Sequence, residues 1–135
     1  MLLLLLAQIA VAPHTQGVEV FQSLVDEAAI ELNIPSPTVV EGVMSDPAPG
    51  AAYYPTNNIW IHPLVFINRA PWEAQRWMAY HEVCHIALRH DGGDKGRTDR
   101  EIAANMCVLD HLMYANQKAQ VFSKWRYSYF DGRNK

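Results

Sequence analysis

The segment His81-Glu82-Val83-Cys84-His85 lies in a run from Trp72 to about His90 that contains neither glycine nor proline. Pro71, just before this run, is typical of the first turn of a helix. The run therefore predicts one long helix, half-buried on the side that carries Trp77, Met78 and Leu88. Residues four apart on a helix differ by about 40° in direction, so His81 and His85 can each aim a ring nitrogen at one ion.

The chemistry of this pattern is that of a zinc site. Zinc takes imidazole nitrogen as a ligand, and a catalytic site leaves one position open for water. Glu82 lies beside that position and can act as general base and then as general acid. We therefore predict that His81 and His85 bind one Zn²⁺ ion and that Glu82 is catalytic. The alternative is that these three residues occur together on a helix by chance and have no chemical role.

A third ligand is required, and His90, Asp91 and Glu101 are the candidates. His90 stands nine residues after His81, which places it on the opposite side of a continuing helix, so it is expected to face solvent. Asp91 has the spacing of peptidases whose third ligand follows directly, but these need a glycine where this chain has Leu88. The sequence therefore favours Glu101.

Glu101 opens a second predicted helix, from near Thr98 to about Ala119, after a glycine-rich turn at residues 91–96. Asn105 follows one turn later and could orient a ligand histidine. Ala104 is small enough to let two helices approach closely. Alternatively, Glu101 could complete a capping box that begins at Thr98. The apolar residues expected along this helix are Ile102, Met106, Leu109, Leu112 and Met113.

The chain before the motif predicts a helix and a small sheet. Apolar residues recur at helical spacing from Val18 to Ile34. Short segments at Thr38–Val43, Ala51–Tyr54 and Ile59–His62 are typical of strands, with a turn signal at Pro55–Asn58 between the last two. The predicted fold class is therefore α+β.

The two motifs together resemble the gluzincins, and among them the small ImmA/IrrE-like metallopeptidases, which join a His-Glu-x-x-His helix to a Glu-x-x-Ala-Asn helix. The resemblance covers roughly Tyr53–Leu112 and implies a zincin-like domain. It includes the pattern Tyr54–Pro63, which is similar to the edge strand of that family. A peptide or protein substrate would then bind along Ile59–His62 by strand addition. Carried over residue by residue, it implies His81, His85 and Glu101 as zinc ligands, Glu82 as general base and acid, and Asn105 as support for a ligand.

Length and charge limit the other possibilities. A chain of 135 residues, half of them hydrophobic, predicts one domain, here residues 18–135. A formal charge of −3 without a basic run argues against nucleic acid as a partner. Two cysteines make no disulfide framework, and a bond between Cys84 and Cys107 is not predicted.

The apolar segment at residues 1–17 is predicted to end in a break at Pro13–Gly17. It is too short to span a bilayer, which takes roughly 20 apolar residues. A signal peptide for export and a helix packed on the domain are both compatible with it. A cytoplasmic location is slightly favoured, and membrane contact is left open.

The sequence thus predicts a zinc-dependent metallopeptidase. One alternative is a non-catalytic zinc-binding domain with a regulatory or interaction role. Another is a hydrolase for a non-peptide amide. An intact Glu82 argues against a purely structural metal site, which needs no base beside the ion.

Overall fold

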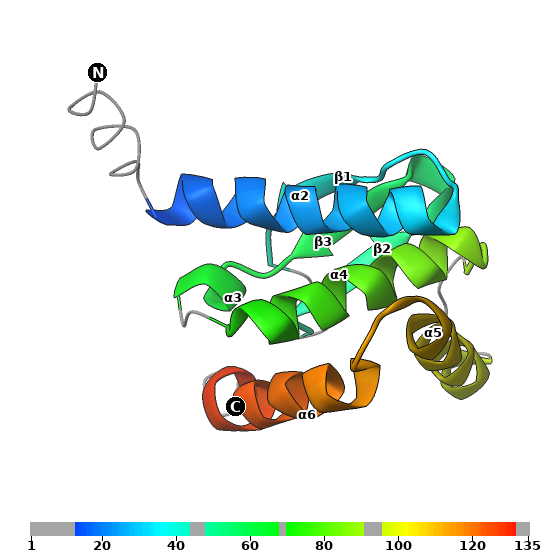
Figure 1. The fold of residues 1–135 in the computed structure, drawn as a ribbon. Coiled ribbons are helices and arrows are strands. Elements are labelled where there is room, and N and C mark those ends of the chain that lie inside the picture. Colours follow the sequence, from blue (N-terminus) through cyan, green and yellow to red (C-terminus); the bar gives the residue numbers. More distant parts are fainter. Residues whose placement is uncertain (1–12, 44–47, 68–69, 91–95, 132–135) are drawn as a thin grey trace, which may run out of the picture.

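A small mixed sheet lies against a layer of helices, so the predicted α+β class is confirmed (Figure 1). The computed structural model describes residues 13–43, 48–67, 70–90 and 96–131. The first twelve residues, and with them most of the predicted apolar segment, lie outside the described residues. So does most of the glycine-rich turn at residues 91–96.

Helix α2 (Pro13–Leu32) starts earlier than predicted. The expected break at Pro13–Gly17 is wrong: proline is well tolerated in the first helical turn, and Gly17 serves close packing rather than a turn. A Cβ at Gly17 would lie 2.8 Å from the ring of Phe66. The predicted apolar stripe is confirmed, because Phe21, Leu24, Val25, Ala28 and Ala29 are all buried.

The sheet contains β1 (Thr38–Glu41), β2 (Gly50–Tyr53) and β3 (Asn58–Ile61), in the order β1-β3-β2. Strand β3 pairs in parallel with β1 and antiparallel with β2. The prediction that Ile59–His62 is an edge strand is therefore wrong. Its apolar residues Ile59 and Ile61 are fully buried because the strand is central.

Short irregular elements surround β3. The predicted turn before it is confirmed as a 3-10 helix η1 (Tyr54–Thr56), after which Asn57 adopts the left-handed conformation with φ 55°. After the strand, the buried His62 accepts a hydrogen bond from the Leu64 N–H at 3.0 Å through Nδ1. This bond caps the short helix α3 (Leu64–Ile67).

Helix α4 (Trp72–Ala87) carries the motif and lies between α2 and α6 (Figure 1). Its residues from Met78 to Ile86 are buried on every side, which explains why the helix shows no strong amphipathic stripe. Tyr80 donates a hydrogen bond of 2.7 Å to Glu27 of α2. The motif is thus held at the centre of the helical layer.

The predicted second helix is in fact two, α5 (Arg97–His111) and α6 (Ala115–Trp125), followed by a π-helical segment η2 (Arg126–Asp131). Tyr114 separates them with φ 57°, although neither glycine nor proline marks the break. Leu112 and Ala115, on either side of Tyr114, are both buried. Among the described residues, no helix is sufficiently long and apolar to cross a bilayer.

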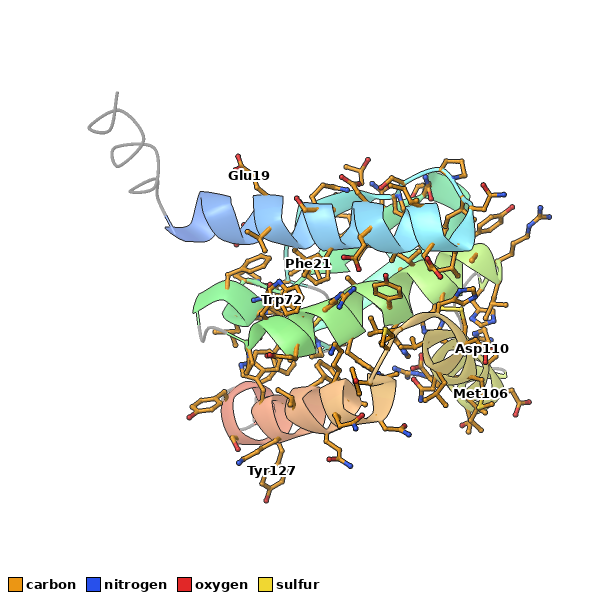
Figure 2. The ribbon with its side chains drawn as sticks, viewed as in Figure 1. Glu19, Phe21, Trp72, Met106, Asp110 and Tyr127 are labelled. Carbon is orange, nitrogen blue, oxygen red and sulfur yellow. A yellow bond between two sulfur atoms is a disulfide. The ribbon has the colours of Figure 1, made fainter. Side chains whose placement is uncertain are left out.

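Helix α5 buries a different face from the one predicted. The buried residues are Ala104 and Val108, with Leu112 just after the helix. The other predicted apolar positions are largely exposed; Figure 2 shows Met106 and Asp110 on the outer side of α5. Small Ala104 allows α5 to approach α4 closely, as expected. The exposed positions are Ile102, Met106, Leu109 and Met113.

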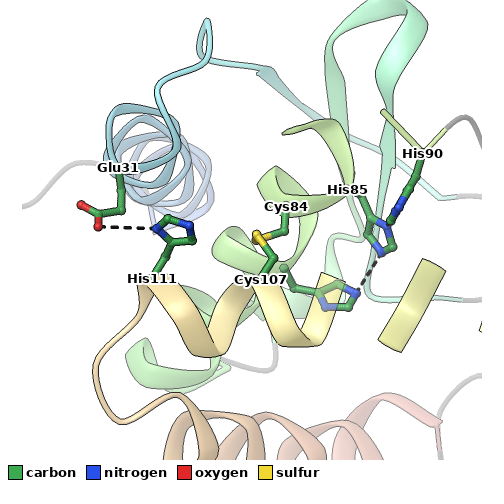
Figure 3. The surroundings of a disulfide bond; sticks show 7 residues. Glu31, Cys84, His85, His90, Cys107 and His111 are labelled. Carbon is green, nitrogen blue, oxygen red and sulfur yellow. Dashed lines mark hydrogen bonds and ion pairs between the residues drawn. A yellow bond between two sulfur atoms is a disulfide. The ribbon is translucent and has the colours of Figure 1, made fainter. Parts of the chain in front are cut away.

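A disulfide joins Cys84 of α4 to Cys107 of α5 (Figure 3). The prediction that these two cysteines are not bonded is wrong, because residue spacing along each helix does not show where the two helices cross. The two helices cross so that Cys107 meets α4 at one position and Glu101 meets it at another. The disulfide fixes α5 to the helix that carries His81 and His85.

Candidate metal centre

Three side chains from two helices converge on one point. His81 and His85 lie one turn apart on α4, and their Nε2 atoms are 3.1 Å apart. Glu101, in the second turn of α5, places Oε2 at 3.0 Å from His81 Nε2 and Oε1 at 3.1 Å from His85 Nε2. The structure thus brings together the three predicted ligands.

This triangle of atoms fits a zinc ion. A tetrahedral zinc with ligand bonds of about 2.0–2.1 Å has ligand atoms roughly 3.3 Å apart. The observed separations of 3.0–3.1 Å lie close to this spacing. Two neutral imidazoles and a carboxylate are also a donor set that zinc binds. The residues present therefore fit the ion on both geometry and chemistry.

Glu101 does not act as a helix cap. The N-cap of α5 is Gly96, in the left-handed conformation, and no side chain of the described residues caps this end. The carboxylate instead lies 3.0–3.1 Å from the Nε2 atoms of His81 and His85, and these two contacts hold the pKa of Glu101 well below its usual range. The capping-box alternative is excluded by this placement.

Glu82 is the buried acid of the site. Its side chain is only 6% exposed, and Oε1 lies 3.9 Å from His81 Nε2. Burial raises the pKa of Glu82 above its ordinary value. Oε2 is buried and has no hydrogen-bond partner among the described residues. Buried polar atoms are rarely left unpaired in native proteins, so this oxygen is suited to receive a group that enters the site.

A cavity of about 480 Å³ opens over these residues. It is bounded by the start of β2, by α4 and α5, and by the end of α6 with η2. At β2 the wall is Gly50, where a Cβ would lie 3.5 Å from Glu82 Oε2. The remaining lining residues include Trp77, Met78, Arg97, Asn105, Phe122 and Arg126.

The ring of His81 is oriented mainly by stacking. Trp77 stacks on it with centroids 4.8 Å apart and an angle of 21°, and Phe122 in turn stacks on Trp77 with centroids 4.8 Å apart. Asn105 lines the same cavity, and its amide is among the groups that raise the pKa of His81. Within the part of the chain that the structure describes, no hydrogen-bond partner is found for His81 Nδ1. The orienting role of Asn105 toward a ligand histidine stays a prediction.

His90 does not stand apart from the site as predicted. Its Nδ1 lies 2.8 Å from Nδ1 of His85. The chain leaves the helical path after Leu88, so counting residues around a continuing helix gave the wrong direction. Among the other residues considered, Asp91 lies outside the described residues. Cys84 is engaged in the disulfide and cannot hold a metal as a thiolate.

Three further side chains that could have stabilised an oxyanion do not line the cavity. His111 pairs with Glu31 at 3.6 Å on the far side of the disulfide from His85 (Figure 3). Tyr114 and Tyr127 are 65% and 80% exposed, and Tyr127 points away from the body of the molecule in Figure 2. None of these three residues belongs to the candidate site.

Comparison of the chain with models of protein families, with curated proteins and with solved structures gives no match.

Proposed function

We propose that this protein is a zinc-dependent metallopeptidase with His81, His85 and Glu101 as the metal ligands. The observation that carries the proposal is the convergence of two Nε2 atoms and one carboxylate at 3.0–3.1 Å. A buried glutamate and an open cavity adjoin the same point. The resemblance of the two sequence motifs to those of the ImmA/IrrE-like gluzincins supports the same proposal.

Glu82 is the proposed general base and acid. Zinc held at this site supplies a Lewis acid that polarises a carbonyl and lowers the pKa of water. The Glu82 carboxylate takes a proton from the attacking water as its oxygen bonds to the carbonyl carbon. Glu82 then passes that proton to the amine as the carbon–nitrogen bond breaks. The unpaired, buried Oε2 is available for both transfers.

We infer that the substrate lies along β2 rather than β3. Gly50, the first residue of β2, lines the cavity, whereas β3 is enclosed between its two neighbours. Within the described residues, β2 pairs only through one edge, with β3. An extended peptide added to the other edge would run past Glu82, and the exposed backbone groups of the strand would bind it. Strand β2 thus replaces Ile59–His62 as the proposed docking edge.

Glu82 also favours a catalytic zinc site over the alternative of a non-catalytic zinc-binding domain. A structural site is closed by four ligands and needs no base. Here the described residues supply three converging ligands, and a carboxylate is buried next to them although burial raises its pKa. Burying a carboxylate costs folding free energy, and a role for the charged form of Glu82 as a base explains why it is there. Hydrolysis of a non-peptide amide would use the same groups, and only substrate screening separates the two.

The test combines metal content with hydrolysis of a peptide library. The parent chain is expected to bind one zinc ion and to lose activity in a chelator. Glu82→Gln should retain zinc and lose turnover by about 10²–10⁴-fold, the usual contribution of a general acid–base group. Loss of a group that only hydrogen-bonds to a metal ligand usually weakens metal binding by roughly 10–100-fold. Glu101→Ala removes a ligand itself and should weaken zinc binding by more than that.

Glu73→Gln is the matched control, because Glu73 is an exposed glutamate on the same helix. It should change neither metal binding nor turnover. The proposal fails if Glu82→Gln cleaves peptides as fast as the parent chain. It also fails if Glu101→Ala keeps the full zinc affinity of the parent.

A further inference from the structure

The end of α4 folds back on itself. Arg89 has φ 58°, a left-handed conformation in which helices commonly end. Its N–H donates to the Ile86 carbonyl at 3.0 Å, and the His90 N–H donates to the His85 carbonyl at 2.9 Å. These two bonds form a Schellman motif. Its consequence is that His90 returns to the level of His85 instead of continuing along the helix.

The two rings then meet through their Nδ1 atoms. The Nδ1–Nδ1 distance is 2.8 Å, and the ring centroids are 5.0 Å apart at 62° (Figure 3). His85 uses its other nitrogen, Nε2, toward His81 and Glu101. Its two nitrogens therefore have separate partners, with the metal cluster on one side and His90 on the other.

We propose that His90 is a positioning residue that fixes the tautomer and the orientation of His85. The inference rests on the proposed zinc site. A ligand Nε2 must offer its lone pair, so the proton of His85 belongs on Nδ1. Two Nδ1 atoms at hydrogen-bond distance require one protonated and one unprotonated nitrogen. His85 Nδ1–H therefore donates, and His90 accepts as the tautomer that is protonated at Nε2.

The two ligand histidines are held in different ways. His81 is stacked on Trp77, and its Nδ1 has no hydrogen-bond partner in the described ranges of the chain. His85 contacts His90 through Nδ1. Loss of the His90 acceptor would thus free the ring of His85 and allow its proton to move to Nε2, where it blocks the lone pair.

The experiment compares His90→Ala with His90→Asn. An asparagine Oδ1 can accept a hydrogen bond near the place of the histidine Nδ1, whereas alanine cannot. Zinc affinity is measured by competition with a chromophoric chelator. We expect His90→Ala to weaken zinc binding by about 10–100-fold, and His90→Asn to restore most of this loss.

A second readout needs no metal. Nitrogen NMR of the zinc-free chain, at a pH well above the ordinary pKa of histidine, reports which nitrogen of His85 carries the proton. Nδ1–H should predominate in the parent and in His90→Asn, and Nε2–H should gain population in His90→Ala. Arg89→Gly is the matched control, because glycine adopts positive φ without strain and keeps the turn.

The inference is overturned if folded His90→Ala binds zinc as tightly as the parent and keeps the same tautomer. It is also overturned if His90→Asn behaves like His90→Ala in both measurements. A parent chain that binds no zinc would instead refute the proposed function. In that case the NMR measurement on the zinc-free chain still decides whether His90 sets the tautomer of His85.

Discussion

Gly50, the first residue of β2, lines the cavity beside the proposed catalytic acid Glu82. A Cβ there would lie 3.2 Å from Ile61 Cδ1, 3.4 Å from the Trp60 carbonyl oxygen and 3.5 Å from Glu82 Oε2. The first of these neighbours is the end of a flexible side chain, which can shift. The second is backbone, and the third is the buried carboxylate. A side chain at this position would therefore fill the space next to Glu82.

We predict that Gly50→Val lowers peptide hydrolysis by roughly 10–100-fold, a usual effect of displacing groups in an active site by about an ångström. Gly50→Ala should have a smaller effect in the same direction. Zinc affinity should stay unchanged, because the three atoms nearest to a Cβ at Gly50 include Glu82 Oε2 but no atom of His81, His85 or Glu101. The measurements are kcat/KM on a fixed peptide and a zinc titration.

Gly42→Ala provides the control for this prediction. A Cβ at Gly42 would crowd the Trp60 ring at 3.1–3.2 Å, but Gly42 does not line the cavity. This substitution tests the effect of crowding the sheet without touching the site. Equal rates for Gly50→Val and the parent chain would refute the assigned role of Gly50.

At the scale of elements, the Cys84–Cys107 disulfide ties the helix with two ligands to the helix with the third. The bond closes a loop with a sequence separation of 23, and Glu101 lies within that loop. Closing such a loop restricts the unfolded chain by about 3 kcal/mol in the chain-entropy model. The same bond restricts α5 in the folded state, where Glu101 must meet His81 and His85.

We predict that replacing both cysteines by alanine lowers the free energy of unfolding by about 3 kcal/mol. Alanine suits the site because Cys84 is fully buried among apolar residues. Zinc affinity should fall as well, since α5 is then held by packing alone. Denaturant titrations with and without a reductant measure the first effect. A reductant should destabilise the parent and leave the double variant unchanged; identical midpoints for all four samples would contradict the prediction.

Elements whose pattern is local could be predicted, and those that depend on tertiary contacts could not. The stripe of α2 and the unbroken run of α4 follow from residue spacing alone. The end of α5 depends on Tyr114 in the left-handed region, which no glycine or proline announces. Strand β3 is central because β1 pairs with it in parallel, although β2 lies between these two strands in the sequence. The order of the strands along the chain does not reveal this pairing.

The same distinction applies to the site. His81, Glu82 and His85 could be predicted because one helix fixes their spacing, and Glu101 because the next helix had to return alongside. His90 could not, since its position follows from the left-handed Arg89 rather than from helical spacing. The disulfide was missed for a similar reason, because it depends on how two helices cross.

For the whole molecule, the metal ligands come from two helices joined by residues 88–96, so only the folded chain presents them together. A ligand that binds the folded state alone stabilises it by RT ln(1 + [L]/Kd), about 2.7 kcal/mol at a hundredfold excess over Kd. We predict that zinc raises the Tm of the parent chain by several degrees, on the order of 10 °C. Glu82→Gln should show the same rise, because Glu82 does not hold the ion, and Glu101→Ala should lose most of it. Calorimetry of the three chains, each with zinc and with a chelator, measures these shifts; a parent chain that melts at the same temperature in both would exclude a site shared between α4 and α5.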